Sequence, residues 1–372
     1  MVFTRRGCGY VVGLLCLVRV VPGLSAGLSP DEAVHLIADY LVQNQVSQGP
    51  DEGTWPDELD FLGPTTSGMA DAYDWTGAEE YHFRAESAAH YLLHAADEQG
   101  NLLGDEAYAI VRMSQVSGFV LEGPYWDYWW AALAEFYHSL RREGYEGSTQ
   151  AYLHWFDDLD PSINVFYFAH HVVAAYYVDD IDKELWRDAL IAELSRVDDM
   201  SAFPVMALGT ATWALAEIDH LDDTAVTLDA NSPCWGGVVL RDLPALLLTH
   251  QVPEGEFYSG SFYWRFDHLA EGSRAGYTED AVYSTRGLAA AASLEVNLQN
   301  KDMEQALTRA EQALLQGIDP IGAVYEHLSQ QGEMRYAFCG EMLEALWSVK
   351  QYRAAQADSL ATDGESAGEA ED

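Results

Sequence analysis

The sequence predicts an all-α protein in which about six pairs of helices close into a ring. Apolar residues recur at helical spacing along most of the chain, and convincing strand patterns are almost absent. The helical segments are of two kinds. Some are apolar nearly all round and rich in small residues, and others have a single apolar face. The two kinds alternate, and a closed ring gives every hairpin the neighbours that it needs to bury its apolar face.

The first helix is predicted to begin after Ser29 and Pro30, which form a helix start signal, and its apolar stripe runs from Val34 to Val42. A loop over residues 45–55 separates it from the next helix. Small-residue and one-sided helices then alternate over residues 66–76, 81–96, 107–116 and 126–140.

The alternation continues in the second half. Residues 165–178 (VFYFAHHVVAAYYV) are apolar on nearly every side, as expected of a helix that is buried all round. Further helices are predicted at residues 186–197, 203–218, 239–249, 287–292, 303–314 and 336–349. The inner, small-residue helices are expected to start near Thr66, Asp105, Val165, Phe203, Thr278 and Arg335.

Three regions are predicted along the chain. Residues 1–29 are typical of an export signal, because Arg5 and Arg6 precede an apolar run and residues 23–26 offer small side chains for cleavage. Residues 30–352 form a single helical domain, and residues 353–372 form an acidic tail that is expected to be disordered. Arg19 interrupts the apolar run and argues against a membrane span. We therefore expect an exported protein, extracellular or periplasmic, that is free of the membrane after cleavage.

The chain is strongly acidic, with a net charge of −41 and only three lysines. Such a surface repels phosphate backbones and anionic membranes, so we expect no binding to nucleic acid. Adaptation to salt explains the charge, since counterions screen the self-repulsion. Attraction of a cationic partner is the alternative.

The cysteines leave the question of a disulfide open. Cys8 and Cys16 lie in the predicted signal, and Cys234 and Cys339 remain, either paired or as two buried thiols. No cysteine and histidine spacing typical of a zinc site is present. We predict no metal centre and no cofactor, although the carboxylates leave room for calcium.

Two segments share a pattern of glutamine, glycine and tryptophan. Gln45 leads to Gly53-Thr54-Trp55, and Gln251 leads to Gly260 and then Trp264 with a different spacing. Both resemble the Q…G-x-W repeats of squalene cyclases. The helix alternation over residues 31–350 resembles the (α/α)6 toroid that terpenoid cyclases and protein prenyltransferases share with polysaccharide lyases and six-hairpin glycosidases. This resemblance implies a central funnel at one end of the inner helices.

Four clusters are expected to meet at that funnel, at residues 104–108, 164–171, 263–268 and 277–280, and each supplies groups suited to proton transfer. The candidate catalytic residues are Asp105, Glu106, His170, His171, Arg265, Asp267, His268, Tyr277, Glu279 and Asp280. The candidate substrate-binding residues are Tyr108, Tyr167, Tyr263, Trp264 and Arg274.

Each cluster also has a structural interpretation. The acidic pairs at 105–106 and 279–280 begin helices, where carboxylates cap free amides. His170 and His171 are adjacent on a helix, so at most one faces the funnel and the other packs in the core. The charges at 265–267 could simply anchor a long loop.

Export, aromatic residues and carboxylates close to histidine and arginine favour a carbohydrate-active enzyme that acts on a polysaccharide or oligosaccharide. A lyase needs a base and a cation at the substrate carboxylate. A hydrolase needs two carboxylates, one from 105–106 and one from Asp267, Glu279 or Asp280. A non-catalytic exported binding or scaffold protein is the alternative. A terpenoid-cyclase-like enzyme is remote, because the D-x-D-D and D-D-x-x-D motifs are missing.

Overall fold

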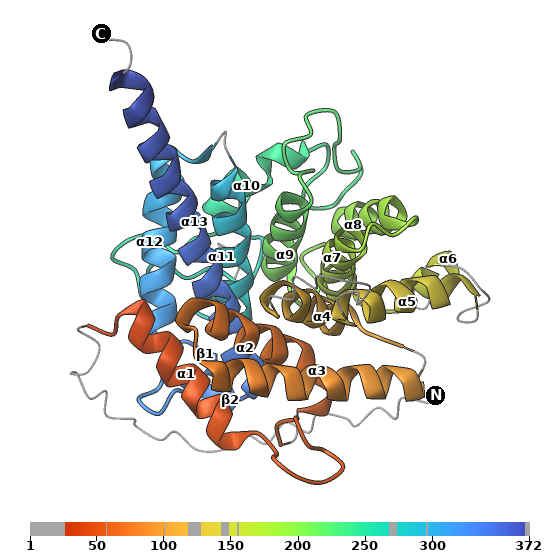
Figure 1. Ribbon diagram of the computed structural model, residues 1–372. Coiled ribbons are helices and arrows are strands. Elements are labelled where there is room, and N and C mark those ends of the chain that lie inside the picture. Colours follow the sequence, from red (N-terminus) through yellow and green to blue (C-terminus); the bar gives the residue numbers. More distant parts are fainter. Residues whose placement is uncertain are drawn as a thin grey trace, which may run out of the picture.

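The computed structural model describes residues 27–56, 58–99, 101–117, 128–142, 149–154, 156–267, 274–294 and 297–368. The predicted signal at 1–26 lies outside this part of the chain. Helices make up most of the structure, which confirms the predicted all-α class (Figure 1). None of the helices within the described ranges combines the length and the apolar character needed to cross a bilayer.

Six helices form a closed inner ring. They are α2 (Leu62–Thr76), α4 (Gly104–Val116), α7 (Pro161–Tyr177), α9 (Pro204–Glu217), α11 (Thr278–Ser293) and α13 (Tyr336–Gly368). Each packs against the next in this order, and α13 packs against α2 and closes the ring. The observed starts differ from the predicted ones by four residues or fewer. The (α/α)6 toroid is therefore confirmed.

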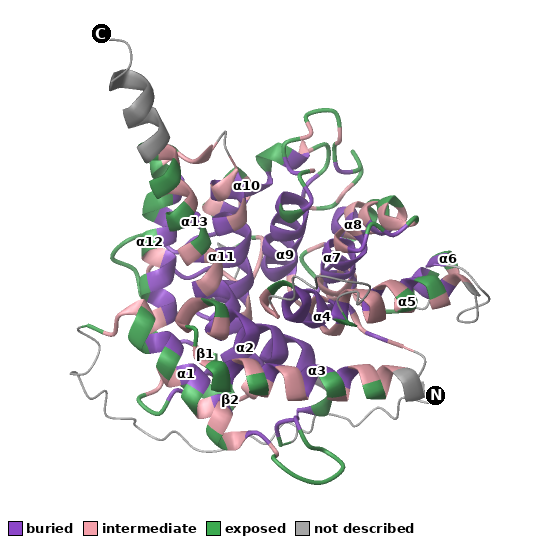
Figure 2. Ribbon diagram, viewed as in Figure 1, coloured by how far each residue is buried: buried purple, intermediate pink, exposed green. Residues whose placement is uncertain are grey.

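The outer layer covers this ring. It consists of α1 (Pro30–Asn44), α3 (Glu79–Gln99), α5 (Tyr128–Arg142), α8 (Lys183–Arg196), α10 (Leu243–Thr249) and α12 (Lys301–Gln316). Figure 2 shows α2, α7, α9 and α11 buried over most of their length, whereas α3 and α12 alternate between buried and exposed residues. This contrast matches the two kinds of helix predicted from the sequence.

Small residues allow the inner helices to pack closely. A Cβ atom on Gly68 of α2 would lie 2.4 Å from the carbonyl oxygen of Gly340 on α13, and one on Gly287 of α11 would lie 2.4 Å from that of Gly209 on α9. The first turns also lie side by side, since a Cβ on Gly63 of α2 would lie 2.6 Å from Asp105 of α4. The inner helices are thus parallel, and their N-terminal ends share one end of the ring.

The two glutamine and glycine segments adopt the same structure. The amide nitrogen of Gln45 donates to the carbonyls of Gly53 and of Arg84 on α3, each at 2.9 Å. That of Gln251 donates to the carbonyl of Gly260 at 3.0 Å and of Ala306 on α12 at 2.8 Å. Each glutamine therefore ties a loop to an outer helix.

Other features of the structure differ from the prediction or extend it. Helix α13 continues through Gly368, across most of residues 353–372, which were predicted as an acidic tail, and the alanines at its start have high helix propensity. A short antiparallel hairpin joins β1 (Tyr325–His327) to β2 (Gln331–Met334), and the unpredicted helix α6 (Thr149–His154) follows α5. Cys234 and Cys339 are free thiols.

Candidate functional site

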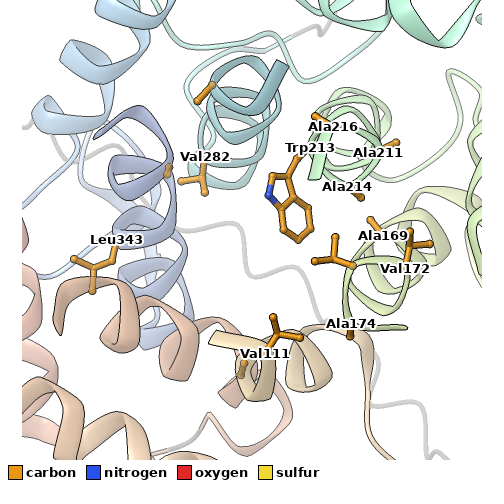
Figure 3. Close-up of a cluster of buried hydrophobic side chains, with 14 of the residues drawn as sticks. Val111, Ala169, Val172, Ala174, Ala211, Trp213, Ala214, Ala216, Val282 and Leu343 are labelled. Atoms are coloured by element: carbon orange, nitrogen blue, oxygen red, sulfur yellow. The ribbon is translucent and has the colours of Figure 1, made fainter. Parts of the chain in front are cut away.

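Side chains from facing inner helices meet in the middle of the ring. The guanidinium of Arg286 on α11 lies 4.1 Å from the ring centroid of Trp213 on α9 and 5.4 Å from that of Tyr108 on α4. Because α4 and α11 occupy opposite positions, these contacts span the ring and fill its interior at this level. Figure 3 shows Trp213 extending into the space that the inner helices enclose.

Ion pairs compensate the charges in this region. Arg286 Nη1 donates to Glu344 Oε2 of α13 at 2.5 Å, and the hydroxyl of Ser67 on α2 donates to the other carboxyl oxygen. Burial raises the pKa of Glu344 to about 7, and the Arg286 charge opposes this shift. Towards the C-terminal ends of the helices, Arg112 Nε donates to Asp71 Oδ1 at 2.6 Å.

Four further carboxyl groups lie nearer the N-terminal ends of α4, α11 and α13, and electrostatic interactions link them to one another and to Glu344. We call Asp105, Glu279, Asp280, Glu341 and Glu344 the carboxyl cluster. Asp105 is the second residue of α4 and is 3% exposed. Burial, reinforced by the neighbouring charge of Glu106, raises its pKa well above the usual range. Its Oδ1 atom has no hydrogen-bond partner.

Asp280 and Glu341 each have a similar unpartnered oxygen. The Asp280 carboxyl bonds the backbone amide of Met206 in the first turn of α9, but its Oδ1 atom has no partner. Tyr283 donates its hydroxyl to Glu341 Oε1 at 2.9 Å, and Glu341 Oε2 has no partner. Burial raises the pKa of both carboxyl groups well above their usual range.

Glu279 is the least buried member of the carboxyl cluster. Burial raises its pKa to about 7, whereas the Arg335 guanidinium lowers it and Glu326 raises it further. Its carboxyl group is therefore the one in the cluster that retains both solvent access and a nearby cation.

These oxygens lie close to partly exposed aromatic rings. Phe166 of α7 is half-buried, and its ring lies 5.4 Å from that of Tyr283. Tyr108 and Tyr167 are half-buried as well. Buried polar atoms in proteins are nearly always hydrogen-bonded, to protein, water or ligand. Three carboxyl oxygens on three inner helices are exceptions to this rule, and all three are buried.

The structure brings part of the predicted site into this region. Asp105, Glu279 and Asp280 belong to the carboxyl cluster, and Tyr108 lies beside it. His170 faces the interior, where its Nδ1 donates to the Phe166 carbonyl at 2.8 Å. Burial and the Arg286 charge lower the pKa of His170, so the imidazole is neutral and helps to fill the ring.

Two of the predicted catalytic residues make contacts that stabilise the helices instead. Glu106 Oε2 accepts a hydrogen bond from the Leu103 amide at 2.7 Å and so caps α4. His171 lies on the outward face of α7, where its ring stacks at 4.4 Å on Trp186 of α8, and burial lowers its pKa to about 3. Because adjacent helical residues point in different directions, His171 is removed from the catalytic candidates.

The loop at 263–267 is anchored to the segment before α9. Trp264 Nε1 donates to the Ala202 carbonyl at 2.7 Å, and Arg265 donates to the Asp199 carbonyl. Tyr263 donates to Glu256 within its own loop at 2.9 Å. These contacts support the anchoring interpretation of this segment rather than a direct catalytic one.

The remaining predicted residues are not part of the carboxyl cluster. Asp267 is exposed and lines a separate cavity of about 550 Å³ together with Asp198, Asp199 and Cys234. Tyr277 directly precedes α11, and its hydroxyl accepts from Arg274 Nη1 at 3.2 Å. His268 lies outside the described residues.

Sequence reasoning missed the charged residues of the ring interior, which are Asp71, Arg112, Arg286, Glu341 and Glu344. The signal was available, because helices predicted to be buried on every side contain charges at spacings of three and four residues. A charge in such a helix must be paired in the interior, since burying it alone is too costly. Among the residues placed in the structure, no group of three or more His, Cys, Asp or Glu side chains is arranged to hold a metal ion.

Comparisons with known proteins identify the fold. No family model matches the chain, and no curated protein matches its sequence. Three solved structures share its architecture. The first is the unsaturated glucuronyl hydrolase from Bacillus sp. GL1, responsible for the degradation of glycosaminoglycan, with a TM-score of 0.55 and 15% identity over 84% of this chain and 94% of that one.

The other two structures belong to similar enzymes. A UGL variant with dGlcA-Glc-Rha-Glc has a TM-score of 0.57 and 14% identity, covering 85% of this chain and 95% of its own. An unsaturated glucuronyl hydrolase specific for heparin has a TM-score of 0.55 and 11% identity, covering 87% and 97%. At this level of identity the similarity establishes a shared (α/α)6 toroid fold and leaves the reaction open.

Proposed function

We propose that this protein is a glycoside hydrolase that acts on an oligosaccharide at the N-terminal end of its inner helices. The observation that carries the proposal is the set of three unpartnered carboxyl oxygens, on Asp105, Asp280 and Glu341, next to half-buried aromatic rings. The similar structures are those of hydrolases that act on carbohydrates, which supports the same class of reaction.

Asp105 is the proton donor in this proposal. A general acid must carry its proton at the working pH, and burial raises the pKa of Asp105 well above its usual range, which favours the protonated form. Because Oδ1 has no partner in the protein, its proton can be donated to the glycosidic oxygen as the bond to the leaving sugar breaks.

Glu279 is the second carboxyl group. It titrates at about 7, is partly open to solvent and has the Arg335 cation nearby, so a substantial fraction is ionised at neutral pH. An ionised carboxylate can take the proton of the attacking water or attack the anomeric carbon itself. Tyr108, Phe166 and Tyr167 offer aromatic faces against which a sugar ring can pack.

The test is an activity screen of the purified protein on oligosaccharides and polysaccharides in salt, with reducing ends and ultraviolet absorbance both recorded. Asp105→Asn is expected to lower kcat by about 100-fold or more, as loss of a general acid does. Asp267→Asn is the matched control, because that carboxyl group is exposed and lies in the loop outside the carboxyl cluster. It should retain activity within about twofold, the range expected of a surface change.

The other outcomes separate the alternatives. An absorbance increase would indicate a lyase, and binding without any cleavage would indicate a non-catalytic carbohydrate-binding protein. Export of the protein is also a proposal, which rests on the pattern of residues 1–29. Its test is the N-terminal sequence of the protein recovered from the culture medium, expected to begin near Ala26.

A further inference from the structure

We infer that a strip of aromatic rings on the rim of the toroid binds a glycan chain, so that the substrate is an oligosaccharide or polysaccharide that extends beyond the sugars next to the cleaved bond. We call the rings of Phe257, Tyr258, His327, Tyr277 and Trp264 the aromatic strip. The inference rests on the proposed function for the position of the cleaved bond. It goes beyond that proposal by assigning a second binding surface, made of residues outside the carboxyl cluster.

Each ring of the aromatic strip contacts the next. The ring centroids of Phe257 and Tyr258 are 4.3 Å apart, and those of Tyr258 and His327 are 4.6 Å apart. The series continues from His327 to Tyr277 at 5.3 Å and from Tyr277 to Trp264 at 5.9 Å. The strip therefore combines side chains from the loop before α11 with one from β1 in a single surface.

This surface is open to solvent. Phe257 is 81% exposed, and the other four rings are half-buried. The Arg265 guanidinium covers one face of Trp264, which ends the strip on that side. A ligand can thus reach these rings directly, whereas the unpartnered oxygens of the carboxyl cluster are buried.

The rings are also held in fixed positions. Gly276 has a φ of 84°, and a Cβ atom at this residue would lie 2.8 Å from the Tyr258 ring and 3.0 Å from the His327 ring, so both rings pack directly on the backbone. His327 Nε2 donates to the Ala275 carbonyl at 3.0 Å, and Nδ1 accepts from the Ser329 hydroxyl at 2.9 Å. Tyr258 has a φ of 65°, which is uncommon for an aromatic residue and persists only where the surrounding structure holds it. Rings that are already ordered lose little conformational entropy when a ligand binds.

The aromatic strip adjoins the proposed site of cleavage. Tyr277 lies two residues before Glu279, the partly exposed member of the carboxyl cluster. The hydroxyl of Thr278 donates to the Tyr325 carbonyl at 2.6 Å, so the strand that carries His327 lies beside the start of α11. A glycan bound at Glu279 therefore has the strip next to it.

Sugar rings are the ligand that suits this surface. The apolar C–H face of a pyranose packs on an aromatic ring, while its hydroxyl groups remain in water. Burial lowers the pKa of His327, so its ring is mainly uncharged at pH 7 and offers no ionic attraction. The strip is thus expected to bind through stacking, in a way that salt does not weaken.

Affinity electrophoresis in native gels tests the inference. The full-length protein is run with and without xylan, galactomannan, hydroxyethyl cellulose or alginate in the gel, and the dissociation constant is calculated from the retardation. Phe257→Ala is expected to weaken binding about fivefold, as the loss of one stacked ring does. Phe257→Tyr keeps a ring and should retain the native affinity. Phe83→Ala is the matched control, because Phe83 is 58% exposed on the outer helix α3, and its loss should leave the retardation unchanged.

The dependence on chain length is the second measurement. Oligosaccharides of the retarding polysaccharide, from the disaccharide to the hexasaccharide, are titrated by calorimetry against the native protein and Phe257→Ala. The affinity of the native protein should increase with length, and the increase should be smaller in Phe257→Ala. Retardation by none of the polysaccharides, equal affinities of the native protein and Phe257→Ala, or binding that high salt abolishes would each overturn the inference.

The two proposals fail in distinguishable ways. If a glycan is bound through Phe257 and is never cleaved, the hydrolase proposal fails and the aromatic strip stands as a glycan-binding surface. If glycans are cleaved with rates that depend neither on chain length nor on Phe257, the hydrolase proposal stands and the inference fails.

Discussion

The buried carboxyl groups predict an unusual dependence of stability on pH. Glu344 has a pKa raised from 4.5 to about 7, because burial outweighs the attraction of Arg286. Between these two values the folded protein binds more protons than the unfolded chain does. The free energy of unfolding must therefore fall as the pH rises from about 4.5 to about 7.

The magnitude follows from the size of the shift. A difference of this size in one pKa is equivalent to about 3 kcal/mol across the window. Asp105, Asp280 and Glu341 also have raised pKa values and act in the same direction. The acidic surface adds repulsion as the pH rises, so the contribution of Glu344 has to be isolated by comparison with Glu344→Gln at one salt concentration.

The assay is urea unfolding followed by tryptophan fluorescence at several pH values between 4.5 and 7.5. The native protein should lose more stability across the window than Glu344→Gln, by up to about 3 kcal/mol. Asp267→Asn, a surface change, should leave the slope of the native protein unaltered. A native protein that gains stability from pH 4.5 to 7, or a Glu344→Gln variant with the same slope as the native protein, would refute the reasoning.

Three further predictions concern the fold. Arg286→Met should destabilise the protein by about 3–5 kcal/mol, because Glu344 would be left buried without its partner, and the double variant with Glu344→Leu should recover part of this loss in the same urea assay. Gly68→Ala should cost about 1–3 kcal/mol or abolish folding, since the new methyl group would meet the Gly340 carbonyl, and thermal unfolding would detect the loss. Gln251→Ala should lower the free energy of unfolding by about 1–3 kcal/mol, because two buried carbonyls lose their donor. Gln45→Ala should have a similar effect. In each variant, amide hydrogen exchange should increase in the loop that the glutamine holds. No effect of either glutamine would show that the loops are held by other contacts.

The sequence was sufficient to predict the ring because each inner helix can be recognised from the pattern of its own residues. A run such as residues 165–178 is apolar on all sides, and no one-sided environment accommodates it. The acidic pairs at 105–106 and 279–280, which are typical of helix N-termini, predicted the starts of α4 and α11 within one residue. The length of α13 was underestimated because residues 353–368 carry no apolar stripe from which a helix could be predicted.

The site was harder to predict, because its members are distributed over four helices, α4, α7, α11 and α13. Local reasoning favoured residues 263–268, where charges and aromatic rings are neighbours in the sequence, and there the charges hold a loop. Arg286 and Glu344 are 58 residues apart and meet only when the ring closes. Which face of α7 is inward, and hence the different positions of His170 and His171, also depends on the packing of neighbouring helices.

Closure of the ring by α13 has a consequence for the folding order. Roughly 260 residues separate the end of α2 from the start of α13, so joining them is a contact of very high sequence separation, which is slow to form. Until α13 is in place, α2 and α11 expose their small-residue faces and Arg286 lacks its counterion. A nascent chain that has not reached Glu344 therefore cannot complete a stable interior. Folding to the native state is expected to be post-translational and to involve the whole ring at once, rather than to proceed hairpin by hairpin during synthesis.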